Sequence, residues 1–229
     1  MAAKTNLLGI NRAGERLVVG ATVAELVRAV ETADSKGAMV VAVHQLAAAQ
    51  DVAAIPTLIT VLGYNNPGAA VAAVDGLVAL GQDAVPALLE QIDGYNYGAR
   101  AWAIRAVALI GDPRALPVLL ETAKGDFALS VRRAAARGLG TIDWAKLPAD
   151  QATSSQREVL EVLIGAAQDP EWVVRYAAMA AIEGLAKALV APATQKPLLL
   201  ACLQQTFHYD ETPAVQARAG RALEVLGEL

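Results

Sequence analysis

Short apolar segments with helical spacing recur along the chain, and polar turns separate them. Three of these segments, residues 55–59, 85–89 and 116–120, carry proline at their second position and begin 30 and then 31 residues apart. Proline is tolerated in the first turn of a helix because its missing N–H has no helical partner to lose. The pattern therefore predicts a series of first helices, each opened by a proline.

An alanine-rich segment follows the apolar one in each unit. Residues 99–107, 131–140 and 174–182 share an arginine at the second position and an alanine at the fifth. Weaker copies begin at Ala38, Ala69 and Val215. Gly81 and Gly111 end two of these segments, where a left-handed residue is favoured. These segments are predicted to be the second helices of repeated helix pairs.

Helix pairs of this kind cannot bury their apolar faces alone, so neighbouring units must stack. The sequence therefore predicts an all-α fold, a crescent-shaped HEAT-like helical-repeat solenoid (α/α superhelix). Thr22 and Glu25 have the spacing of a capping box. We expect residues 1–21 to form an N-terminal extension and residues 22–229 a single solenoid of five or six helix pairs. Residues 143–157 and 191–197 are expected to be longer exposed connections.

Composition narrows the class of protein. The chain is 55% hydrophobic but only 4% aromatic, with a net charge of −4, which is unlike a nucleic-acid-binding protein. One cysteine, Cys202, and two histidines, His44 and His208, make a disulfide framework or a metal centre unexpected. Since no long apolar run is present, we expect a cytoplasmic protein without a membrane span.

Three arginines occupy the same repeat position, the second residue of the second helix: Arg100, Arg132 and Arg175. Stacked repeats would place them in a row on the concave side. Their guanidinium groups could hold a ligand that carries carboxylates, or an acidic protein surface. The alternative is structural, because arginine in such repeats can pair with an aspartate of the neighbouring unit.

Aromatic residues concentrate at the repeat turns and the helices that follow them. The candidates for contact with a flat ligand are Tyr95, Tyr97, Trp102, Trp172 and Tyr176. Aspartates also precede the second helices, namely Asp93, Asp126 and Asp169. They are weak catalytic candidates, and capping of the turns is their alternative role. No motif typical of a catalytic centre is present, so the catalytic residues stay unknown.

The combined pattern resembles a known family. The stretches 64–77, 95–105, 126–140 and 169–177, and above all the Y-N-Y-G-A-R-A-W sequence at 95–102, are similar to the phycobilin lyases of the E/F type, and within them to the smaller subunit. The resemblance covers about residues 22–190 well and the C-terminal unit loosely. An N-H-C-Q-G-N motif, which marks the isomerising relatives, is absent from this sequence.

The resemblance implies a cyanobacterial, phycobilisome setting. It implies a lyase that works as a heterodimer with a CpcE-like subunit and attaches phycocyanobilin, its substrate, through a thioether to a cysteine of the phycocyanin alpha chain. It implies no permanently bound cofactor. Arginine would then hold the propionates of the bilin, and the aromatic side chains would cover its rings. A non-catalytic HEAT-like adaptor or chaperone that binds phycobiliproteins is the alternative function.

Overall fold

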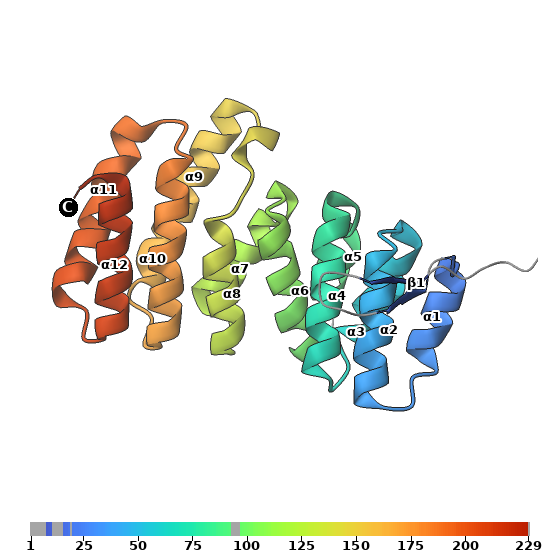
Figure 1. Cartoon of the computed structure of the whole chain (residues 1–229). Helices are drawn as coiled ribbons and strands as arrows, with labels where there is room; N and C mark the ends of the chain where they lie inside the picture. The colour runs from blue at the N-terminus through green and yellow to red at the C-terminus, as the bar shows by residue number, and fades with distance from the viewer. Residues whose placement is uncertain (1–7, 11–15, 19, 93–96, 229) are drawn as a thin grey trace, which may run out of the picture.

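The computed structural model describes residues 8–10, 16–18, 20–92 and 97–228, and within these residues the α-helices form consecutive pairs (Figure 1). The first helices of the pairs are α1 (Val23–Glu31), α3 (Ile55–Val61), α5 (Val85–Ile92), α7 (Leu116–Gly125), α9 (Ala149–Ala166) and α11 (Pro192–Tyr209). The second helices are α2 (Lys36–Ala48), α4 (Pro67–Leu80), α6 (Tyr97–Ile110), α8 (Leu129–Leu139), α10 (Trp172–Lys187) and α12 (Pro213–Leu226). The all-α, HEAT-like solenoid fold is confirmed.

Short elements complete the part of the chain that the structure describes. Four 3-10 helices lie before α3, α5, α7 and α9: η1 (Val52–Ala54), η2 (Gly81–Asp83), η3 (Pro113–Ala115) and η4 (Trp144–Lys146). Two short strands, β1 (Leu8–Ile10) and β2 (Arg16–Val18), pair antiparallel ahead of α1, with Gly9 opposite Leu17. This hairpin was not predicted from the sequence.

The sequence signals for helix ends operate as predicted at several places. Thr22 and Glu25 form a reciprocal capping box at the start of α1, with the Thr22 amide donating to the Glu25 carboxylate at 2.8 Å. Gly81 and Gly111 have positive φ values of 63° and 69°, as expected of helix-ending glycines. Asn66 caps α4 and also donates to the carbonyl of Lys36 at 3.0 Å, so this polar turn residue joins neighbouring repeats.

Two expected exposed connections are largely helical, so those predictions are wrong. Helix α9 begins at Ala149, and Trp144 in the preceding 3-10 helix is buried. Helix α11 begins at Pro192 and continues through Pro197. In α9 the buried positions include Ala152 and Gln156, which are too weakly apolar to reveal a helical period.

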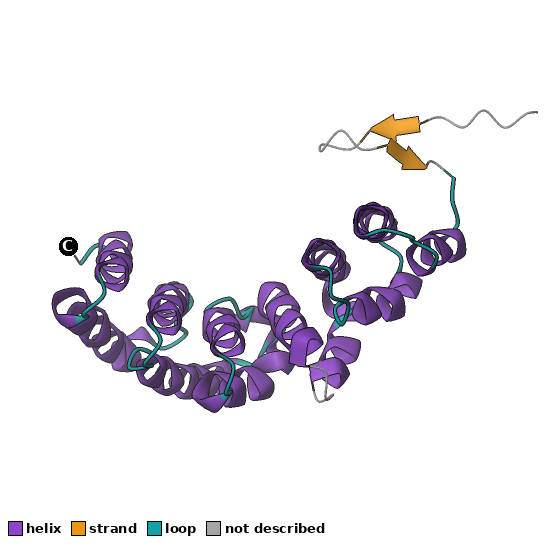
Figure 2. Cartoon of the chain, turned by 90° about the horizontal axis from the view of Figure 1, so that it is seen from below, coloured by secondary structure: helices purple, strands orange, loops and turns teal. Residues whose placement is uncertain are grey.

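The helices form two layers of an arc, and the second helices line its inner, concave side (Figure 2). Small residues bring these inner helices close together: a side chain at Gly76 would collide with Ala47, and one at Gly138 would collide with Ala108. The inner helices therefore pack more extensively on one another than the outer helices do. This difference in spacing curves the solenoid.

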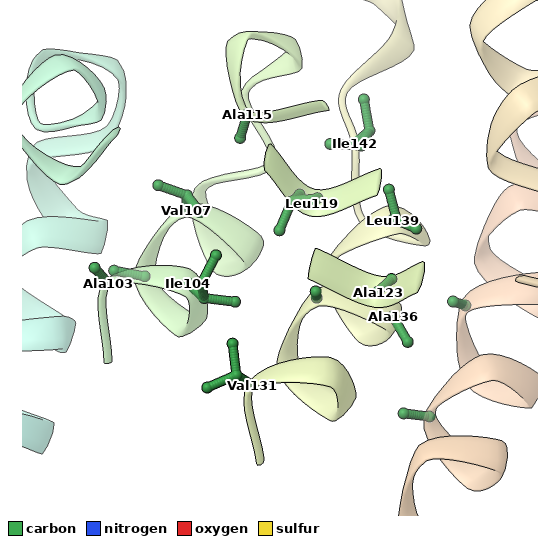
Figure 3. Close-up of a cluster of buried hydrophobic side chains, with 14 of the residues drawn as sticks. Ala103, Ile104, Val107, Ala115, Leu119, Ala123, Val131, Ala136, Leu139 and Ile142 are labelled. Atoms are coloured by element: carbon green, nitrogen blue, oxygen red, sulfur yellow. The ribbon is translucent and has the colours of Figure 1, made fainter. Parts of the chain in front are cut away.

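The apolar core runs between the two layers. In the central repeats Ile104 and Val107 from α6 meet Leu119 from α7 and Val131 and Leu139 from α8 (Figure 3). All five side chains are buried. In the described part of the chain, no single helix is long and apolar enough to cross a membrane, and only the bent pair 67–83 and 85–92 meets the length and composition limits together.

Candidate functional site

Arg132 on α8 connects two neighbouring repeats through its guanidinium group. Its Nε and Nη2 donate to the two carboxylate oxygens of Asp169 at 2.8 and 3.1 Å. Its Nη1 donates to the backbone carbonyls of Asp126 and Phe127 at 2.8 and 3.3 Å. The fork therefore binds the turn before its own helix and the equivalent turn of the next repeat.

Arg175 on α10 repeats the arrangement one unit later. Its Nε and Nη2 donate to Asp210 at 2.8 and 3.1 Å, and its Nη1 donates to the carbonyls of Asp169 and Pro170 at 2.9 and 3.2 Å. The side chains of Arg175 and Asp210 are only 8% and 6% exposed. Gln216 occupies the same position on α12 and donates to the Asp210 carbonyl at 2.8 Å. It thus ends the row.

Arg100 on α6 begins the row in the described residues. Its Nη2 lies 3.1 Å from Asp126, while its buried Nε has no hydrogen-bond partner among the described residues. We call Arg100, Asp126, Arg132, Asp169, Arg175 and Asp210 the Arg–Asp ladder. The structure therefore shows the aspartate pairing that was the alternative to ligand binding. A propionate at Arg132 or Arg175 would have to displace a carboxylate that is already bound by both ends of the fork.

Two carboxyl groups of the ladder, Asp169 and Asp210, have lowered pKa values. Burial alone would raise the pKa of Asp169 and Asp210, but hydrogen bonds from Arg132 and Arg175, and from the backbone amides of Glu171 and Thr212, hold both values below the ordinary range. Asp126 and Asp169 also accept the amides of Ala128 and Glu171. These contacts match the capping role that was set against a catalytic one.

The lowered pKa values predict a loss of stability in acid. A carboxyl whose folded pKa is depressed contributes stability that is fully present above its unfolded pKa, about 3.9, and is lost as pH falls through the folded pKa. Urea unfolding midpoints should therefore be flat near pH 7 and fall steeply below about pH 4. Asp210→Asn, which removes one such group, should show a shallower decline. An equally steep decline in that variant would contradict the assignment.

A groove on the concave side carries a different set of arginines. Arg105, Arg133 and Arg137 project from α6 and α8 into an open hollow of about 410 Å³, bordered by Leu109 and by Tyr176 from α10. All three arginines are exposed, and none forms an ion pair with a carboxylate among the described residues. We call this the concave groove. In this groove, positively charged side chains without a carboxylate partner among the described residues lie beside apolar and aromatic side chains.

Only some of the aromatic residues predicted to contact a ligand lie at or near the groove. Tyr176 borders the groove, and Trp172 lies one helical turn before it on α10, 46% exposed. Trp102 packs against the hydrophobic core. Tyr97 begins α6, whereas Tyr95 and the candidate Asp93 lie outside the described residues.

The groove arginines were not among the site residues predicted from the sequence. A signal was available: Arg105 and Arg137 occupy one repeat position, five residues after Arg100 and Arg132. Cys202 is not part of the groove, and burial raises the pKa of its thiol to about 11. It is a protonated core side chain near neutral pH rather than a nucleophile.

The stacked helix pairs and the groove on their inner side are those of a helical-repeat protein, and comparison with known proteins agrees. A family model described as HEAT repeats matches residues 65–140 and 85–183, so this is a HEAT-repeat protein. The chain is 58% identical over 170 residues to the phycocyanin alpha phycocyanobilin lyase CpcF of Synechocystis sp., covering 74% of this chain and 79% of that protein. It is 56% identical to a phycobilisome maturation protein of Synechococcus elongatus, covering 85% and 93%.

A solved structure agrees with these relatives. The complex of CpcE and CpcF of phycocyanin lyase from Nostoc sp. contains a chain with 51% identity and a TM-score of 0.69, covering 75% of this chain and 99% of that one. The chain thus belongs to the family of phycocyanobilin lyase subunits that includes CpcF.

Proposed function

We propose that this chain is the CpcF-like subunit of a heterodimeric bilin lyase and acts with a CpcE-like subunit. The enzyme attaches phycocyanobilin to a cysteine of the phycocyanin alpha chain. The acceptor thiol adds across the ethylidene double bond of the bilin, so a C–S bond forms and the thiol proton passes to the tetrapyrrole. The nucleophile comes from the acceptor, and phycocyanobilin is a substrate rather than a resident cofactor.

The concave groove is the structural feature that supports this proposal most directly. A bilin is a flat open tetrapyrrole with two propionates, and the groove offers three guanidinium groups beside Tyr176 and Leu109. Arg105, Arg133 and Arg137 would bind the propionates, and Tyr176 and Trp172 would contact the rings. Positioning of the bilin against the acceptor thiol would be the main catalytic contribution.

The shape of the groove also supports a two-subunit enzyme. The hollow is open on one side, and its 410 Å³ lies near the lower end of the range for small-molecule sites. A bilin bound here would stay partly in contact with water unless a second protein covered it. The Arg–Asp ladder is proposed to brace the repeats behind the groove, with Arg100, the most exposed of its arginines, able to contribute to propionate binding.

Substitution of the groove arginines tests the proposal. Arg133→Gln and Arg137→Gln should each weaken phycocyanobilin binding to the two-subunit complex about 10-fold, because each removes a charge-assisted hydrogen bond. Absorbance titration with phycocyanobilin measures the affinity, and zinc fluorescence of the acceptor chain measures transfer. Arg221→Gln is the matched control, since Arg221 occupies the repeat position of Arg137 on α12 but does not line the groove.

The outcomes separate the candidate functions. Unchanged binding and transfer in an Arg133→Gln, Arg137→Gln double variant would remove the groove from the proposal. If the native complex binds apo-phycocyanin but neither binds nor transfers bilin, the adaptor or chaperone function replaces the lyase function.

A further inference from the structure

Exposed aromatic side chains follow one edge of the solenoid. They lie where first helices give way to second helices, along the lower edge in Figure 1. Four repeats each contribute one: Tyr64, Phe127, Trp172 and Tyr209, which are 40%, 73%, 46% and 82% exposed. We call these four residues the aromatic edge. Since the chain is only 4% aromatic, packing needs do not account for their recurrence on this surface.

The Arg–Asp ladder fixes three of the four turns that carry these side chains, namely those of Phe127, Trp172 and Tyr209. Arg132 binds the backbone carbonyls of Asp126 and Phe127, while Arg175 binds those of Asp169 and Pro170 just before Trp172. At the third turn, Asp210 follows Tyr209 and accepts from Arg175 and from the Thr212 amide. Aromatic side chains on turns held in this way lose little backbone freedom when they bind, which favours their use as binding hot spots.

The spacing of the edge indicates the kind of partner. Stacked helices lie about 8–10 Å apart, so the aromatic side chains are separate points rather than one continuous apolar patch. Exposed carboxylates accompany two of them, Glu171 beside Trp172 and Glu211 near Tyr209, although Glu211 also lies 3.3 Å from Arg175. Obligate interfaces are more continuous and more apolar, whereas separate aromatic anchors with a charged rim are typical of transient complexes. The matching surface has apolar sockets and basic residues beside them.

The edge and the concave groove are continuous. Trp172 belongs to the edge, and Tyr176, one turn later on α10, borders the groove. A protein docked on the edge would present its nearest surface to whatever the groove holds. This continuity favours a protein substrate over a partner that only supports the fold.

We infer that the aromatic edge is the docking surface for the acceptor protein, which presents apolar sockets flanked by basic side chains. This inference rests on the proposed function, because it gives the bilin in the groove a thiol to react with. Apart from Arg100, the ladder then positions the edge rather than binding a ligand.

A double substitution tests the docking surface. Phe127→Ser with Tyr209→Ser removes two anchors that do not line the groove, and should raise the KM for the apo acceptor at least about 10-fold in the two-subunit complex. The kcat at saturating acceptor and the absorbance titration with phycocyanobilin should stay within about twofold of native. The matched control is Val52→Ser with Leu198→Ser, which removes two exposed apolar side chains away from the edge.

A second measurement keeps the two proposals distinguishable. Calorimetric titration of the complex with apo acceptor, in the absence of bilin, should show the same loss of affinity in the double variant. If the native complex binds acceptor through the edge but forms no product, the lyase proposal fails and the edge stands. If the double variant and the native protein bind the acceptor with equal affinity, the aromatic edge is not the docking surface. Loss of association between the double variant and the CpcE-like subunit would also contradict the proposal.

Discussion

Arg175→Met is expected to lower the free energy of unfolding by about 3–5 kcal/mol, the usual cost of removing one partner from a buried ion pair. The substitution leaves the Asp210 carboxylate, only 6% exposed, without its fork, and leaves the carbonyls of Asp169 and Pro170 without their donor. Methionine keeps most of the side-chain volume, so the loss of polar contacts dominates. Urea unfolding followed by circular dichroism at pH 7 measures the effect.

The rest of the ladder gives a graded series for comparison. Arg132 is 13% exposed and Arg100 is 28% exposed, so Arg132→Met should cost less than Arg175→Met, and Arg100→Met should cost the least. Arg221→Met is the control, because that side chain is 70% exposed and pairs only loosely with Glu224 at 3.8 Å. It should change stability by less than about 0.5 kcal/mol. Equal losses of unfolding free energy at all four positions would show that burial does not determine how much each arginine contributes to stability.

The helix pairs could be predicted from the sequence because their signals are local. Proline in the first turn, glycine at the end and alanine at the packed positions each act within one helix or between adjacent ones. The start of α9 could not be predicted, because Gln156 is buried there for a tertiary reason. Its side chain donates to the Ala188 carbonyl and accepts the Val190 amide, both more than thirty residues away. A polar residue satisfied in this way gives no apolar period to recognise.

In the candidate site, too, the features set within one repeat could be predicted, and those set by tertiary packing could not. The sequence correctly placed Arg100, Arg132 and Arg175 in one row, since that follows from the repeat register. The arginines could face either a ligand or the aspartate of the next repeat. The outcome depends on the distance between repeats, and the sequence of one repeat does not determine that distance. The groove arginines lie on α6 and α8 as well. The repeat register places Arg105 and Arg137 at one position, but their exposure beside Tyr176 of α10 is a tertiary feature.

Gly140→Val is expected to destabilise the protein by about 3 kcal/mol, or to prevent folding, because it would separate α8 from α10. A Cβ at Gly140 would lie 2.7 Å from the carbonyl oxygen and 2.8 Å from the Cβ of Ala181, and closer still to the Cα of Ala181. Two of these three contacts involve backbone atoms, so no rotamer change relieves them, and such overpacking usually costs about 1–3 kcal/mol. Urea unfolding measures this effect as well.

The matched control has the opposite sign. Gly165 lies inside α9, and a Cβ there meets nothing within 4 Å, so Gly165→Ala should stabilise the protein by about 0.5–1 kcal/mol. Because Gly140 lies in the inner layer, any Gly140→Val protein that folds should have a flatter arc and a larger radius of gyration in small-angle X-ray scattering. An unchanged radius would mean that inner-layer spacing does not set the curvature. The groove, which spans α6, α8 and α10, would then owe its shape to another cause.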